Sequence, residues 1–226
     1  MYIIGRTMVF LHLITALVLS LSSLQQGEQL FLDNKPREAL PHLEKALYEN
    51  PQEEKIYLYL GIVYEQIGDT EKSIQILKRG LNVSEGYKDL FYYNLGNNHF
   101  RQEEFTVAEQ MYSNALQING ALEVAYLNRA NSRLELEEFQ DARQDYIDYL
   151  RLDPDSPQRE NIEKLIALLG RAIEEAERKR EEELARQKAL LNEVLDSLKN
   201  ASEDTRNLSA GSEEIQEEYE EIDIEN

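Results

Sequence analysis

Two pairs of asparagines are the residues of this chain best suited to make directed hydrogen bonds. Asn94 and Asn97 are three positions apart, and Asn128 and Asn131 repeat this spacing further along the chain. Residues three apart on a helix project on one side, so each pair would present two amides together. An amide has both a donor and an acceptor, which suits it to hold the backbone of an extended polypeptide. These residues predict non-covalent recognition.

Residues suited to catalysis or metal binding are sparse. His12, His42 and His99 are far apart in the sequence, and the chain has no cysteine. The glycines form no phosphate-binding loop, and no group of residues has the spacing of metal ligands. We therefore expect a protein that is not an enzyme and that uses no cofactor and no metal, with His99 as a packed residue.

A repeating pattern runs through most of the chain before the C-terminal third. The repeats begin at Ser20, Glu54, Asp89 and Glu123, and the interval between the second and third starts is one residue longer than the other two. Small residues recur at one position of the repeat, at Gly61, Gly96 and Ala130. A larger side chain there would force two packed helices apart. Self-similarity at a period of about 34 residues predicts a solenoid built from helix pairs.

The repeated positions resemble the tetratricopeptide repeat family over residues 20 to 156. The family pattern of Leu-Gly, Tyr, Ala, an aromatic residue and a closing Pro is matched by Leu60-Gly61, Tyr64, Ala108, Tyr112 and Pro154. The resemblance implies an all-α, right-handed α-solenoid of about four helix-turn-helix repeats. We expect a degenerate first repeat at 23–53, repeats at 54–88, 89–122 and 123–156, a capping helix with a charged helical extension at 157–199, and a disordered acidic tail at 200–226.

Two departures from the family pattern are informative. The junction at 82–86, between the second and third repeats, lacks the closing proline and accounts for the one inserted residue. In the fourth repeat, Arg129 and Arg133 replace the usual Leu and Tyr. The two arginines predict that this repeat presents charge at its edge.

The resemblance also assigns a binding surface, because the first helices of such repeats line a concave groove. The matching positions are Leu58, Ile62, Tyr93, Asn94, Asn97, Phe100, Arg101, Leu127, Asn128 and Asn131. An alternative for Asn94 and Asn128 is that they bond within the solenoid and stiffen it. The basic clamp that chaperone-binding relatives use for a terminal carboxylate is absent, because its positions carry Leu58, Val124 and Asn128.

The N-terminus has the pattern of a targeting segment. Arg6 precedes an apolar run, Met8–Leu21, and small polar residues follow. This pattern predicts a signal peptide at 1–22 or an uncleaved membrane anchor at 7–24; a third alternative is an apolar helix packed on the first repeat. Both favoured interpretations place the repeats outside the cytoplasm, in the cell envelope: periplasmic or secreted if cleaved, single-pass anchored if not. Contact with a membrane is expected only through 7–24.

The C-terminal third changes in character. A helical stripe that includes Ile162 and Leu169 predicts the capping helix, and Leu184, Leu191, Leu195 and Leu198 form a narrower stripe further on. The second stripe fits either a coiled coil or a solvated helix, since fewer than three clean heptads are evident. From residue 200 onward, ten acidic residues and one arginine predict disorder. The net charge of −20 argues against nucleic-acid binding.

Together these features predict an interaction scaffold or adaptor, exported or membrane-tethered, that holds a segment of a partner protein in the groove and acts in envelope protein assembly. Two alternatives remain open. One is a structural homo-oligomer, joined through repeat edges or the C-terminal helix. The other is a peptide- or solute-binding component of a transport system, which would need an enclosed pocket.

Overall fold

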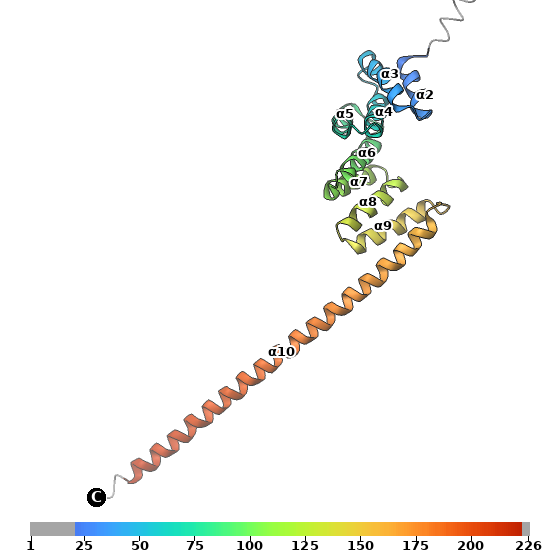
Figure 1. The fold of residues 1–226 in the computed structure, drawn as a ribbon. Helices are drawn as coiled ribbons and strands as arrows, with labels where there is room; N and C mark the ends of the chain where they lie inside the picture. The colour runs from blue at the N-terminus through green and yellow to red at the C-terminus, as the bar shows by residue number, and fades with distance from the viewer. Residues whose placement is uncertain (1–20, 223–226) are drawn as a thin grey trace, which may run out of the picture. The chain divides into compact units, whose positions relative to one another are not determined.

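The computed structural model describes the backbone of residues 21–222 and the side chains of residues 21–202. This range contains nine helices and no strand, which confirms the all-α prediction (Figure 1). The predicted signal peptide or anchor lies almost wholly in residues 1–20, outside the described residues. Within the described range, no helix has both the length and the apolar character needed to cross a bilayer.

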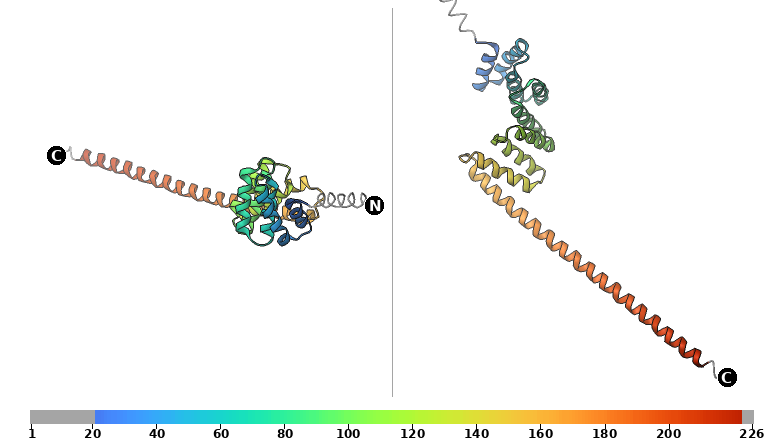
Figure 2. Two further views of the ribbon diagram at one scale, coloured as in Figure 1. Left: turned by 90° about the horizontal axis from the view of Figure 1, so that it is seen from above. Right: turned by 180° about the vertical axis from the view of Figure 1, so that it is seen from behind.

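Eight of these helices form four consecutive pairs joined by short turns. The pairs are α2 (Ser23–Leu32) with α3 (Pro36–Glu49), α4 (Glu54–Gln66) with α5 (Thr70–Val83), α6 (Lys88–Arg101) with α7 (Phe105–Ile118), and α8 (Glu123–Glu135) with α9 (Phe139–Leu152). Each helix contacts its neighbours in the chain, and the first helices of successive pairs also contact one another (Figure 2). This arrangement is the predicted solenoid of four repeats.

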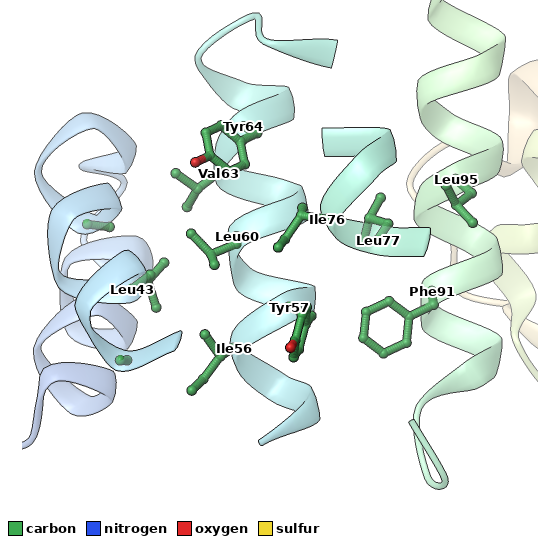
Figure 3. Close-up of a cluster of buried hydrophobic side chains, with 12 residues drawn as sticks. Leu43, Ile56, Tyr57, Leu60, Val63, Tyr64, Ile76, Leu77, Phe91 and Leu95 are labelled. Carbon is green, nitrogen blue, oxygen red and sulfur yellow. The ribbon is translucent and has the colours of Figure 1, made fainter. Parts of the chain in front are cut away.

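Small residues allow the two helices of a repeat to approach closely. A Cβ atom on Gly96 of α6 would lie 2.5 Å from Cε1 of Tyr112 on α7, and one on Gly61 would collide with Leu77. The role predicted for the two glycines is therefore confirmed. Between repeats, the core is continuous: Tyr57 and Phe91 lie side by side in Figure 3, and Gly80 faces both of them.

One residue in the turn of each repeat adopts a left-handed backbone conformation. These residues are Asn34, Gly68, Glu103 and Glu137, with φ angles of 56°, 87°, 61° and 59°. Asn and Gly tolerate positive φ, whereas a glutamate there is strained. Each of the four occupies the same position when it is counted from the start of its own repeat, so the turns keep the sequence register.

The junction that carries the inserted residue is held by a carboxylate. Oε2 of Glu54 accepts hydrogen bonds from the Ser84 hydroxyl (2.6 Å) and from the backbone N–H groups of Glu85 and Gly86 (2.8 and 3.2 Å). These bonds lower the pKa of Glu54, with the Ser84 hydroxyl as the main cause. A side chain from the start of the second repeat thus takes the place of the missing proline and holds the backbone at the start of the third repeat.

The prediction that Arg129 and Arg133 present charge at an edge is wrong. Their side chains are 16% and 18% exposed, and both donate to the buried carboxylate of Asp145 on α9. Arg133 also pairs with Glu109 of α7 at 2.8 Å. We call these four residues the ion cluster. The long side chains fold inward because the second helices of repeats three and four supply carboxylates that neutralise them.

The last helix, α10 (Arg159–Ile222), spans two compact units that meet between Leu169 and Gly170. In the first unit, Ile162 and Leu169 are buried in a cluster with Tyr146 and Tyr149, so this part of α10 caps the last repeat as predicted. In the second unit, ion pairs one turn apart support the helix, at Glu175–Lys179 (2.7 Å) and Arg178–Glu182 (2.6 Å).

The predicted disorder from residue 200 differs from the structure, in which α10 continues to Ile222. Low hydrophobicity argues against a packed core but not against a single helix, whose backbone groups bond to one another. This stretch contains no proline and many glutamates, which favour helix.

Candidate functional site

A pocket of about 270 Å³ opens among repeats two to four. It is lined by Glu65 of α4, Asn97, Phe100 and Arg101 of α6, Tyr112 of α7, and Asn128 and Asn131 of α8. Six of these seven residues belong to first helices. The lining includes five of the ten groove residues named from the sequence.

A hydrogen-bond network orients the central amide of the pocket. Oδ1 of Asn97 accepts from the Tyr112 hydroxyl and from Nδ2 of Asn128, both at 2.9 Å. Nδ2 of Asn128 also donates to the Tyr93 hydroxyl at 3.2 Å. The rings of Tyr93 and Tyr112 are tilted against each other, with centroids 5.9 Å apart. The network therefore ties α6, α7 and α8 together at the pocket wall.

The second amide of α8 is held in the same way. Oδ1 of Asn131 accepts from the Tyr146 hydroxyl at 2.7 Å. Burial raises the pKa of Tyr112 and raises that of Tyr146 to about 12. Both hydroxyls are therefore protonated near neutral pH and can donate. Each donated hydrogen bond fixes which end of its asparagine amide faces the protein.

The opposite ends of the Asn128 and Asn131 amides are left open to the pocket. Within residues 21–202, no hydrogen bond reaches Oδ1 of Asn128 or Nδ2 of Asn131, whereas the Asn97 amide also bonds to the Tyr93 hydroxyl. The pocket wall thus offers one carbonyl acceptor and one amide donor, each pre-oriented by a bond behind it. The ring of Phe100 adds apolar contact surface, and the buried Tyr112 ring supports the wall behind it.

One ion pair from neighbouring repeats lies at the pocket. Nε of Arg101 is 2.8 Å from Oε1 of Glu65, whose side chain is only 10% exposed, while that of Arg101 is 61% exposed. Burial raises the pKa of Glu65, and the nearby guanidinium partly offsets this effect. Most of the Arg101 side chain is exposed, so its remaining N–H groups can bind a further acceptor.

The other predicted groove residues lie outside the pocket lining. Leu58 and Leu127 pack against the apolar clusters of their repeats, and Ile62 is half-buried. Asn94 is buried and donates to the Leu90 carbonyl oxygen of its own helix at 2.7 Å. Asn94 therefore bonds within the solenoid, as the alternative interpretation held, whereas Asn128 bonds internally and also lines the pocket.

Two lining residues, Glu65 and Tyr112, were absent from the sequence prediction. Glu65 occupies in repeat two the position that Phe100 occupies in repeat three, so counting by the period could have found it. Tyr112 lies on a second helix, whereas the prediction considered only first helices. Its access to the pocket depends on Gly96, which lets the ring approach α6.

His99 is packed rather than available for chemistry. Its ring is largely buried, and Nδ1 contacts the Glu104 carboxylate across the turn. Among the side chains that the structure describes, no group of three or more acidic or histidine residues is placed to hold a metal ion.

Comparisons with known proteins agree with this architecture. Two family models, both described as tetratricopeptide repeat, match residues 30–86 and 93–157. No curated protein sequence matches significantly. The crystal structure of MamA is similar with a TM-score of 0.56 and 21% identity, covering 65% of this chain and 83% of that one.

Two further solved structures share the fold. MamA 41-end from Desulfovibrio magneticus RS-1 matches with a TM-score of 0.53 and 16% identity, over 68% of this chain and 92% of that chain. A chain of the APC/C hetero-tetramer Cut9-Hcn1 matches with a TM-score of 0.59 and 15% identity, over 65% of this chain and 29% of that one. The two family models together cover more than half of the sequence, and the helix pairs that they match form a solenoid. This chain belongs to the tetratricopeptide repeat family.

Proposed function

We propose that this protein is an interaction scaffold that holds an extended segment of a partner protein in the pocket formed by repeats two to four. The observation that supports the proposal is the set of three pre-oriented amide groups on Asn97, Asn128 and Asn131. An extended backbone presents N–H and C=O groups in alternation, and these groups match an acceptor on Asn128 and a donor on Asn131, each of fixed direction.

Pre-orientation supports binding because an ordered side chain loses less conformational freedom when a ligand arrives. Phe100 supplies apolar contact for the side chains of the segment, and Arg101 supplies a cation at the rim. The chain as a whole carries a net charge of −20. A strongly acidic segment would be repelled over most of the surface, so we expect a neutral or basic one.

The partner can be captured by a photo-crosslinking amino acid placed at Phe100, which lines the pocket. The matched control carries the same amino acid at Gln75, an exposed residue of α5. The proposal expects covalent adducts from the pocket position and none from the control position. Mass spectrometry of the adducts would identify the segment, which can then be synthesised as a peptide.

The double substitution Asn97→Asp with Asn131→Asp is expected to weaken binding of that peptide by about one to two orders of magnitude, at roughly 1.4 kcal/mol per decade. Aspartate keeps the oxygen that accepts from Tyr112 or Tyr146 but removes the amide donor, which in Asn131 faces the pocket and in Asn97 supports Tyr93 at the pocket wall. Alanine would be a poorer choice, because it leaves two buried hydroxyls unpaired at about 1–3 kcal/mol each. Isothermal titration calorimetry measures the change.

A control with the same change of charge is Gln75→Glu with Asn82→Asp, at two exposed positions of α5. This variant should bind the peptide normally, and both double variants should unfold near the wild-type temperature. Full affinity in the pocket variant, together with loss of binding after truncation at Lys179, would move the binding surface to α10.

We also propose that the repeats work outside the cytoplasm, in protein assembly in the cell envelope. The support is the sequence pattern of Arg6 before Met8–Leu21. Ser22 forms a capping box with Gln25 at the start of α2, so cleavage after Ser22 would remove this cap and a retained leader would keep it. An alkaline-phosphatase reporter fused after Lys199 should be active; an inactive reporter on a soluble cytosolic product would refute export. An intact mass separates a start at Ser23 from a start at Met1.

A further inference from the structure

The second compact unit carries an apolar stripe that no described residue covers. Its members are Leu184, Leu190, Leu191, Val194, Leu195 and Leu198, with exposed fractions between 47% and 63%. Single exposed leucines are ordinary on a protein surface, but a contiguous stripe of this kind marks an interaction site. The stripe follows a wholly charged segment, 177–183, and so begins abruptly at Leu184.

The stripe belongs to a heptad pattern that continues to the end of the described helix. With Leu184 as position a, the a positions are Leu184, Leu191, Leu198, Thr205, Ser212 and Tyr219. The d positions are Gln187, Val194, Ala201, Leu208, Ile215 and Ile222. Nine of these twelve residues are apolar. Because α10 is one helix as far as Ile222, all twelve positions fall on one continuous seam.

The charged residues follow the same heptad register and avoid its a and d positions. Of the fourteen charged residues between 184 and 222, none is at an a or d position, and eleven are at b, c or f. Positions b, c and f face away from the seam of a coiled coil. A merely solvated helix has no reason to keep charge off one seam over six heptads. The high acidity of the distal part is therefore compatible with self-association.

We propose that α10 from Leu184 to Ile222 is a parallel, in-register coiled coil between copies of this chain. The partner is a second copy because the seam is self-complementary. Parallel alignment also places Glu183 at position g against Lys188 at position e of the neighbour, an attractive pair. Leucine at a with β-branched residues at three d positions favours assemblies of more than two helices. This inference does not depend on the proposed function of the pocket.

Sedimentation equilibrium of the full chain tests the association. The wild type should form oligomers, and Leu191→Glu with Leu198→Glu should raise the dissociation constant at least ~100-fold, because each copy buries two charges in the seam. The matched control, Ala185→Glu with Ala189→Glu, adds the same charges at b and f and should associate as the wild type does. A monomeric wild type would overturn the proposal, as would association that survives the two leucine substitutions.

Disulfide crosslinking tests the direction, since the natural chain has no cysteine. Gln187→Cys and Ala201→Cys, both at d, should each give a linked dimer on oxidation. Ala189→Cys, at the outward f position, should not. Oxidation that links neither d-position variant, while the oligomer persists, would overturn the parallel, in-register arrangement.

Discussion

Replacement of Asp145 by isoleucine is expected to lower the free energy of unfolding by about 3–5 kcal/mol. The Asp145 carboxylate is 3% exposed and accepts from Arg129 at 2.7 and 2.8 Å and from Arg133 at 2.8 Å. Without it, two largely buried guanidinium groups lose their shared counter-charge. Urea unfolding followed by tyrosine fluorescence measures the loss, since the chain has thirteen tyrosines and no tryptophan.

The second repeat supplies the control for this experiment. At the positions of Arg129, Arg133 and Asp145 it carries Leu60, Tyr64 and Ile76. The triple variant Arg129→Leu, Arg133→Tyr and Asp145→Ile should regain most of the lost stability, because well-packed apolar residues can replace a buried ion network. A single Asp145→Ile variant as stable as the wild type would show that Glu109 alone balances both arginines.

Gly96→Leu is expected to destabilise the protein by about 1–3 kcal/mol through overpacking. The first atom added, Cβ, would already lie 2.5 to 2.9 Å from three atoms of the Tyr112 ring. Tyr112 is 1% exposed, and its hydroxyl is bonded to Asn97, so the ring has little freedom to move. Urea unfolding measures the effect. Peptide binding should fall as well, because displacement of Tyr112 reshapes the pocket.

The matched control is Gly120→Leu, in the exposed turn before α8. A Cβ there would have only the Leu116 carbonyl oxygen near it, at 3.8 Å. This variant should unfold within about 0.5 kcal/mol of the wild type, as is usual for surface substitutions. If the two leucine variants lose equal stability, close approach at Gly96 is not what stabilises the repeat.

The sequence was sufficient to predict the repeats because each repeated position has a local physical role. Gly61 and Gly96 indicate where two helices touch, because a larger side chain would not fit there. The period of the repeat predicts the position of each turn, and the four left-handed residues from Asn34 to Glu137 lie at that position. Half of the named groove residues line the pocket for the same reason: position within a repeat determines the face on which a side chain lies.

The features that could not be predicted from the sequence depend on contacts between residues that are distant along the chain. Arg129 was assigned to an edge because its partner, Asp145, is on another helix and looks like an ordinary surface acid in the sequence. Asn94 and Asn97 have the same residue type, yet only contacts decide that the first bonds its own helix and the second lines the pocket. The helical tail was missed because polarity was equated with disorder.

The carboxylate of Glu54 has a consequence for how this solenoid tolerates changes in length. Each residue inserted within a helix turns the following side chains by about 100°, which would rotate the buried face of every later turn into water. The extra residue here lies instead at the start of α6, before the first buried residue of that helix: the linker 84–87 is as long as the linkers 50–53 and 119–122, whereas α6 is one residue longer than α4 and α8. Glu54 anchors this junction by accepting hydrogen bonds from Ser84 and from two backbone N–H groups. The angular phase of α6 is therefore preserved. Insertions and deletions in this architecture should be neutral where a side chain from outside the loop can anchor the altered backbone.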